Sequence, residues 1–170
     1  MAKQSPTLRN VSYSEKPVVL EPSPAGGEIP EFHLADRGWT LLIARVLFSV
    51  IFILASFAHF TPAYVDYATN NGVLYANLLV PLAGVIAGVG GLSILLGYRT
   101  RMGAALIILF LIPVTLMMHA FWTITDPGAQ ALQKVMFLKN IGLIAGALYI
   151  ARFGAGRISL DARRRRANRD

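Results

Sequence analysis

Four long apolar segments constrain the fold of this chain more than any other feature. They run over about residues 40–60, 78–97, 102–122 and 135–151. A helix needs about 20 apolar residues to cross the hydrocarbon core of a bilayer, which is roughly 30 Å thick. The first three segments reach that length, and the fourth reaches it with its flanking residues. The sequence therefore predicts an all-α integral membrane protein built as a four-helix bundle.

Composition supports a membrane location and narrows the classes of function. Hydrophobic residues make up 55% of the chain and charged residues 15%, and the mean hydropathy is +0.53. The chain has no cysteine, which excludes a disulfide-exchange protein and an iron–sulfur cluster held by thiolates. The net charge of +7 comes largely from arginines that flank apolar segments. We therefore expect membrane lipids as partners, and no nucleic acid.

Basic residues also predict the orientation of the segments. Arginines lie in the short turn between the second and third segments and again in the C-terminal tail, whereas the two longer loops carry Asp66 and Asp126. Because basic loops stay in the cytoplasm, we expect both termini on that side. One set of arginines is expected to contact lipid or a partner protein: Arg45, Arg99, Arg101, Arg163, Arg164, Arg165 and Arg166.

Two tails flank the predicted bundle. Residues 1–36 contain several prolines and no apolar face of useful length, so we expect a flexible N-terminal tail there. The four apolar segments and their turns occupy residues 37–153. Residues 154–170 are rich in arginine and are expected to form a basic cytoplasmic tail.

The polar residues of the first segment share one face of the predicted helix. At 100° per residue, Arg45, Ser49, Phe52, Ser56 and His59 fall within about 80° of arc. The opposite face is aliphatic, so this stripe is expected to face the interior of the bundle. Arg45 is nearest the cytoplasmic end, where it either extends to lipid head groups or caps backbone carbonyl groups.

A second group of polar residues is expected at one depth in the outer half of the bundle. His59 ends the first segment, His119 ends the third, and Lys139 and Asn140 begin the fourth. Ionisable groups inside membranes are rare, and they usually face the bundle interior or a wet cavity. We therefore predict that these four residues form a polar, ligand-binding pocket open to the outer side.

Each of these residues also has a structural interpretation. Lys139 could pair with Asp66 or Asp126 from the outer loops. Asn140 could simply bond a neighbouring helix, and the two histidines could be ordinary interfacial residues.

The predicted pocket is cationic and amphipathic. Lys139 would attract an anion or polarise a carbonyl group, and a histidine can exchange a proton near neutral pH. These properties suit the head of a quinone or a small oxyanion. No metal is expected, because the four segments contain no carboxylate. A haem between His59 and His119 is disfavoured, because the charge of Lys139 would oppose positive charge on the iron.

Several of the same residues carry a resemblance to a known family. Arg45, the turn Leu96–Arg101, His119 and the run Phe137–Asn140 resemble the DoxX family of bacterial four-helix membrane proteins, over about residues 38–155. The resemblance implies a multi-pass protein of the bacterial plasma (inner) membrane. Related proteins include a subunit of a thiosulfate:quinone oxidoreductase, so it also implies an association with redox enzymes.

Three functions follow from these observations. The first is an accessory subunit of a larger membrane complex linked to electron transfer, which anchors or stabilises its partner subunits and helps to bind a quinone. The second is a self-sufficient quinone-linked oxidoreductase of the thiosulfate:quinone type, which is weaker because the chain offers no obvious redox centre of its own. The third is a small-solute transporter, in which a homo-oligomer would form the path. Against the transporter, the segments contain no acidic residue to couple ions and no clear inverted repeat.

Overall fold

The computed structural model describes residues 34–168, and it is helical with no strand in that range. The predicted N-terminal tail lies outside the described residues except for positions 34–36, which belong to the first helix. The elements in chain order are α1 (Leu34–Ala58), α2 (Pro62–Asn70), α3 (Ala76–Leu96), α4 (Thr100–Met118), the 3-10 helix η1 (Phe121–Thr123), α5 (Pro127–Phe153) and α6 (Leu160–Ala167). Four of them, α1, α3, α4 and α5, are long and apolar enough to cross a membrane. The predicted all-α membrane bundle of four helices is confirmed.

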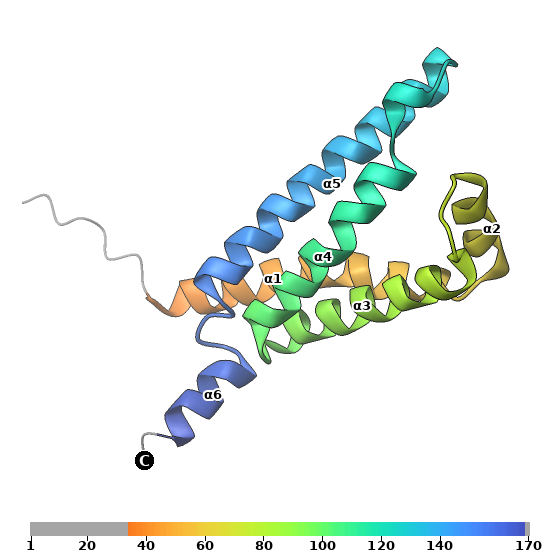
Figure 1. Ribbon diagram of the computed structural model, residues 1–170. Helices are drawn as coiled ribbons and strands as arrows, with labels where there is room; N and C mark the ends of the chain where they lie inside the picture. The colour runs from red at the N-terminus through yellow and green to blue at the C-terminus, as the bar shows by residue number, and fades with distance from the viewer. Residues whose placement is uncertain (1–33, 169–170) are drawn as a thin grey trace, which may run out of the picture. The chain divides into compact units, whose positions relative to one another are not determined.

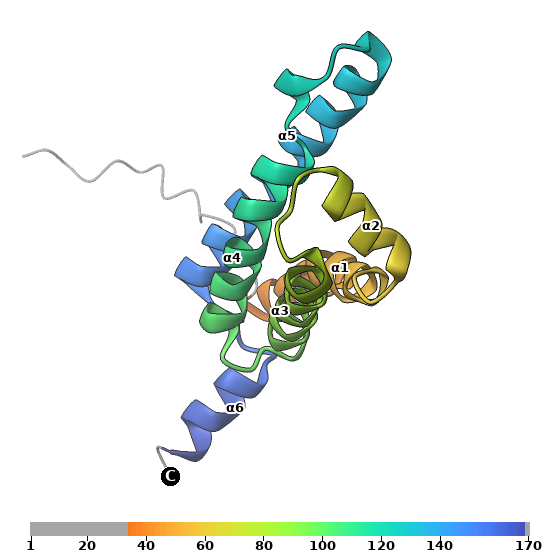
Figure 2. The same ribbon diagram turned by 45° about the vertical axis from the view of Figure 1, so that its right-hand side comes forward.

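The four spanning helices pack in the order α1, α3, α4, α5 (Figure 1). At the end that carries the α3–α4 turn and α6, which we call the basic end, the helices lie close together. Toward the other end, which carries α2 and η1 and which we call the open end, α4 and α5 diverge from α1 and α3 (Figures 1 and 2). This divergence leaves room between the two pairs.

The close approach of α1 to α3 depends on glycines of α3. A Cβ atom at Gly84 would lie 2.6 Å from the Cβ atom of His59, and a Cβ atom at Gly91 would lie 3.3 Å from that of Phe52. Small residues allow such contact where lipid gives no hydrophobic drive for helix association. The polar stripe of α1 is consequently buried, as its arc predicts: Arg45, Ser49, Phe52, Ser56 and His59.

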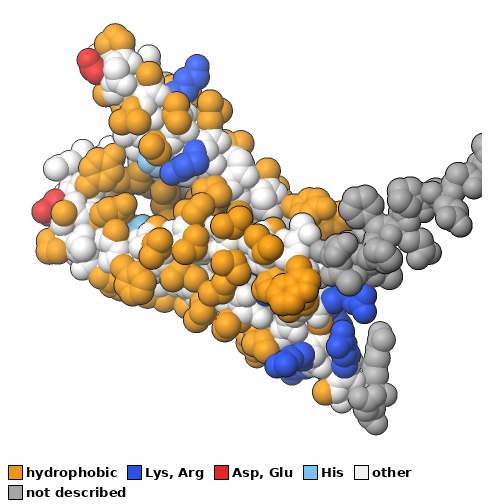
Figure 3. Space-filling model, turned by 180° about the vertical axis from the view of Figure 1, so that it is seen from behind, with side chains coloured by type: hydrophobic (Ala, Val, Ile, Leu, Met, Phe, Trp, Pro, Cys, Tyr) orange, Lys and Arg blue, Asp and Glu red, His pale blue; other side chains and the backbone are white. Residues whose placement is uncertain are grey.

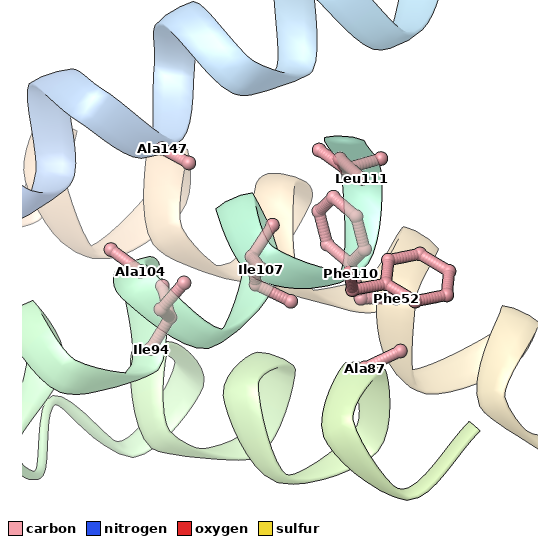
Figure 4. Packing of buried hydrophobic residues seen from close by; sticks show 8 residues of the cluster. All are labelled: Phe52, Ala87, Ile94, Ala104, Ile107, Phe110, Leu111 and Ala147. Atoms are coloured by element: carbon pink, nitrogen blue, oxygen red, sulfur yellow. The ribbon is translucent and has the colours of Figure 1, made fainter. Parts of the chain in front are cut away.

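The hydrophobic core joins all four spanning helices (Figure 4). Its buried residues are Phe52 of α1, Ala87 and Ile94 of α3, Ala104, Ile107, Phe110 and Leu111 of α4, and Ala147 of α5. The rings of Phe52 and Phe110 meet edge to face, with centroids 6.3 Å apart. Because α4 supplies half of the cluster, it is the helix through which α5 is attached to the rest of the bundle.

Two helices outside the apolar segments, α2 and α6, were not predicted, and α5 extends well beyond the apolar run at residues 135–151. The extension begins with a capping signal: the Asp126 carboxylate accepts a hydrogen bond of 2.7 Å from the N–H of Ala129, and Pro127 occupies the first turn. This start is polar, so a search for apolar length could not find it.

The basic tail contains α6, which docks on the α3–α4 turn. The Asp161 carboxylate accepts hydrogen bonds from the N–H groups of Arg99 and Thr100, at 2.8 and 3.1 Å, and from the Thr100 hydroxyl at 3.0 Å. Burial favours the neutral carboxyl, but these hydrogen bonds and nearby Arg165 outweigh burial and hold the pKa of Asp161 below its ordinary value. Asp161 therefore acts as an N-terminal cap for α4, supplied by another helix.

Candidate functional site

A cavity of about 470 Å³ lies at the open end, among residues of α1, α2, α3, α4 and α5. Figure 3 shows a hollow on this face, with histidine side chains inside it and basic side chains near its rim. The volume falls within the range of roughly 300–1,000 Å³ that small-molecule sites occupy. The divergence of α4 and α5 from α1 and α3 therefore produces a space large enough for a ligand.

All four residues of the predicted pocket line this one cavity: His59, His119, Lys139 and Asn140. They come from three different helices. His59 and His119 follow the last residues of α1 and α4, whereas Lys139 and Asn140 lie near the middle of α5, which begins at Pro127 and not, as predicted, just before them. The remaining wall is mostly aliphatic and aromatic. The cavity thus combines a small polar cluster with an apolar lining, the usual arrangement of a site that orients an amphipathic ligand.

His59 is held in a defined orientation. Its Nδ1 atom lies 2.8 Å from the carbonyl oxygen of Ala55, and its ring packs against the rings of Tyr64 and Phe110, with centroids 5.0 and 5.5 Å away. A carbonyl oxygen can only accept, so Nδ1 carries the hydrogen, and Nε2 of the neutral ring holds a lone pair. No described residue bonds Nε2, which leaves this atom available to a ligand.

His119 belongs to a short polar chain around the cavity. Its Nδ1 atom lies 2.7 Å from Oε1 of Gln133, and Nε2 of Gln133 donates a long hydrogen bond of 3.5 Å to the hydroxyl of Tyr67. The chain joins the end of α4 to α5 and α2. The sequence prediction missed Gln133 and Tyr67, although Gln133 is two helical turns before Asn140 and so shares its face of α5.

Asn140 and Lys139 have no polar partner within the described chain. Asn140 is 4% exposed, yet its side chain forms no hydrogen bond with the residues that the structure describes. Lys139 is exposed, and the same range contains no ion pair between it and Asp66 or Asp126. Pairing with those aspartates and a bond from Asn140 to a neighbouring helix are therefore absent from the structure. The amide of Asn140 is not among the fully buried atoms that lack a partner, so it opens into the cavity, where a ligand can bond it.

Metal-binding chemistry finds no support in the described part of the chain. No three His, Cys, Asp or Glu side chains among residues 34–168 are grouped so that they could hold an ion. The expectations about quinone and haem stay predictions.

Arg45 lies at the basic end and is 4% exposed. Its Nε atom donates to the carbonyl of Ile94 at 3.0 Å, and Nη2 donates to that of Leu95 at 2.7 Å. Its Nη1 atom donates to the carbonyls of Ala155 and Ile158, at 2.6 and 2.8 Å. Of the two alternatives, capping of backbone carbonyls is the one that the structure shows. The positive charge meets the negative end of the α3 dipole and joins α3 to the α5–α6 linker.

The other arginines of the predicted lipid-contact or partner-contact set are exposed at the same end: Arg99, Arg101, Arg163, Arg164, Arg165 and Arg166.

One family model and two inner membrane proteins match most of this chain. The model of the SURF4 family matches residues 25–167. The inner membrane protein YphA of Escherichia coli (strain K12) is 31% identical over 131 residues, which cover 76% of this chain and 93% of YphA. The inner membrane protein YqjF of the same organism is 30% identical over 132 residues, which cover 75% of this chain and 92% of YqjF. No solved structure matches the chain.

These matches settle the location and correct the predicted family. Both relatives are inner membrane proteins and the chain has four helices able to span a membrane, so it is a multi-pass inner membrane protein. Membership of the DoxX family is wrong, because the matching family model is a different one. The link to redox enzymes that the DoxX resemblance implied loses that support. By its sequence over residues 25–167, this chain belongs to the SURF4 family.

Proposed function

We propose that this protein binds an amphipathic molecule whose polar head enters the cavity at the open end. The observation that carries the proposal is Asn140, which is 4% exposed, lines the cavity and has no hydrogen-bond partner among the described residues. Proteins nearly always satisfy buried polar groups. The amide of Asn140 opens into the cavity and has its hydrogen-bonding groups free for a ligand.

The donors and acceptors of the cluster define the head group. Lys139 can only donate, whereas Asn140 can both donate and accept. His59 and His119 each use Nδ1 within the protein, so in their neutral forms Nε2 accepts. A complementary head therefore needs an oxygen that accepts from Lys139 or Asn140 and a hydroxyl that donates to a histidine. The ring hydroxyls of a quinol can both accept and donate, and the carbonyl oxygens of the corresponding quinone can accept from Lys139 or Asn140, so we favour this class of ligand.

The apolar lining supports a hydrophobic body attached to that head. It contains side chains from all four spanning helices, including Ile51, Ile86, Leu109, Val114 and Leu143. Burial of apolar ligand surface contributes about 25 cal/mol per Å², so the tail supplies affinity while the polar cluster fixes the orientation. A small hydrophilic anion would use the cluster and leave this lining without a role.

A binding titration tests the proposal. A short-chain ubiquinone analogue is titrated by calorimetry into the purified protein in nanodiscs. We expect Asn140→Leu and Lys139→Met each to weaken binding by about tenfold, the effect of losing one hydrogen bond to a buried site. Matched controls are Asn77→Leu and Lys134→Met. Both control residues are exposed and outside the cavity, so their variants should bind as the wild type does.

Two results would contradict the proposal. Equal affinity for the quinone in Asn140→Leu and Asn77→Leu would show that the polar cluster does not bind the head. Tighter binding of an alkyl carboxylate of similar length, lost in Lys139→Met, would show that the ligand is an anion and not a quinone.

We also propose an accessory role beside other membrane subunits, because α5 is poorly covered by its own chain. Only 11% of the spanning part of α5 is buried inside the protein, against 33% for α3. Purification from native membranes in mild detergent, followed by mass spectrometry, tests this role. A protein present in stoichiometric amount supports it, and a chain that purifies alone or as a homo-oligomer contradicts it.

A further inference from the structure

A second hollow, of about 750 Å³, lies at the basic end and shares no residue with the first. It is bounded by the start of α1, the end of α3, the α5–α6 linker and α6. Its apolar wall consists of Trp39, Leu42, Leu95, Leu96, Ile158 and Leu160, and its basic residues are Arg45, Arg157, Arg163 and Arg166. We call this hollow the basic groove. Basic side chains gather at this end of the molecule in Figure 3.

The basic groove carries an excess of positive charge, because four arginines line it and Asp161, which stabilises the charge of Arg45, lies outside its lining. Among residues 38–168, whose side chains the structure describes, no acidic side chain lines the groove and none forms an ion pair with its four arginines. Arg45 is buried and donates four hydrogen bonds to carbonyl groups, so one of the five N–H groups of its guanidinium is unused. An anion in the groove would balance the remaining positive charge and would accept a hydrogen bond from that N–H group.

The groove also lies where a phospholipid head group would be. Trp39 is 63% exposed and lies in the first turn of the spanning part of α1, a position at which tryptophan usually marks the membrane interface. Leu95 and Leu96 end the spanning helix α3 at the same level. Arginine matches phosphate oxygens through paired N–H groups, and the apolar wall continues into the membrane.

We propose that the basic groove binds one anionic phospholipid of the adjoining leaflet. Arg157, Arg163 and Arg166 bond its phosphate, Arg45 supplies charge from beneath, and the acyl chains lie along Trp39 and the leucines of the wall. The positive-inside pattern assigns this leaflet to the cytoplasmic side. The site is independent of the ligand proposed for the cavity at the open end.

The sequence of α6 provides a control for this proposal. Arg163 and Arg166 line the groove, whereas Arg164, in the same run, does not. Arg101 is exposed at the same end of the molecule and is also outside the groove. The variants R163Q/R166Q and R101Q/R164Q therefore remove equal charge from one end of the protein and differ in whether the lost charge faces the groove. Arg165 is kept in both, because it stabilises the charge of Asp161.

The experiment titrates phosphatidylglycerol into the delipidated full-length protein and counts bound lipid by native mass spectrometry. A basic residue at a membrane surface contributes about a factor of five to the binding of anionic lipid. We therefore expect R163Q/R166Q to weaken the affinity for the first bound lipid roughly twenty- to thirtyfold. The variant R101Q/R164Q should leave that affinity nearly unchanged. Where R163Q/R166Q fails to fold, Arg157→Gln in the linker should still weaken binding about fivefold.

Three outcomes would overturn the proposal. Equal binding of phosphatidylcholine would show that the groove does not select negative charge. Displacement of the lipid by inorganic phosphate at equal concentration would show a site for the free anion, with no use of the apolar wall. Equal weakening in the two double variants would show diffuse attraction of lipid to the whole basic end.

Discussion

Substitution of Arg45 by methionine should destabilise the protein strongly. This is expected even though the residue lies in a membrane-spanning helix, where methionine costs less than arginine to place in lipid. The guanidinium is almost fully buried and joins α1 to α3 and to the α5–α6 linker through four carbonyl groups. Methionine keeps much of the volume and removes every donor. The three segments would lose their common polar contact.

The size of the effect follows from the burial of the four hydrogen bonds. Those to Ile94 and Ala155 are buried, and hydrogen bonds to charged groups contribute roughly 1.5–3 kcal/mol each. Those to Leu95 and Ile158 are partly buried, so water replaces them at little cost. Relief from desolvating a buried cation offsets part of the loss. We expect the free energy of unfolding to fall by about 3 kcal/mol, a decrease of about 6–12 °C in Tm for a chain of this size.

Thermal unfolding in detergent, followed by tryptophan fluorescence, measures the shift. Arg101→Met is the control, because Arg101 is exposed at the same end and its loss should change stability by less than about 0.5 kcal/mol. Arg45→Lys should recover only part of the loss, since one ammonium group cannot reach four carbonyls. If the Tm of Arg45→Met lies within about 2 °C of that of Arg101→Met, the hydrogen bonds from Arg45 to the four carbonyls do not hold these segments together.

Three further predictions concern other contacts. Asp161→Asn should cost about 1 kcal/mol at neutral pH. Because the native pKa of Asp161 is lowered, the difference from wild type should be full above about pH 4 and vanish as pH falls through that pKa, which thermal unfolding across acid pH measures. Gly84→Ala should cost about 1–3 kcal/mol, since its Cβ atom would lie 2.6 Å from that of His59, whereas Gly142→Ala, with nothing within 4 Å, should be neutral or stabilising. Gln133→Leu should free the His119 ring and raise the NMR-measured mobility of that ring without altering the Tm of the bundle by more than about 3 °C.

The parts of the structure that follow from helical periodicity and length were predictable. The arc of α1 identified the buried stripe, because a single helix determines which of its residues share a face. The cavity cluster was predictable only in part. His59 and His119 end α1 and α4 as expected, but Lys139 and Asn140 lie near the middle of α5, because the polar start of that helix at Pro127 carries no apolar signal.

Contacts between segments far apart in the chain could not be predicted in this way. Arg45 bonds a linker 110 residues away, and Asp161 caps a helix that begins 61 residues earlier. Neither pairing leaves a local pattern, because each depends on how complete helices are placed. The divergence of α4 and α5 from α1 and α3 also depends on how complete helices pack. The sequence therefore indicated which polar residues line the cavity, but it did not indicate how large the cavity is.

The error over the family has a physical explanation. Two of the motifs that suggested DoxX have structural roles in this chain. Arg45 ties the end of α3 to the following segments, and the arginines of the α3–α4 turn fix orientation through their charge. Such residues are selected by folding and membrane topology. They therefore resemble one another across families and carry little information about what each protein binds.

The two ends of the molecule differ in how their polar groups are satisfied, and this difference separates stability from binding. At the basic end, Arg45 and Asp161 bond backbone groups of other helices and hold the elements together. At the open end, the side chain of Asn140 and Nε2 of His59 have no hydrogen-bond partner within the described chain, and α4 and α5 diverge from α1 and α3. The polar groups at the open end therefore do not add to the free energy of unfolding unless a ligand bonds them. Substitutions at Arg45 should therefore lower Tm with the ligand affinity of the folded protein unchanged, whereas substitutions at Asn140 should do the reverse.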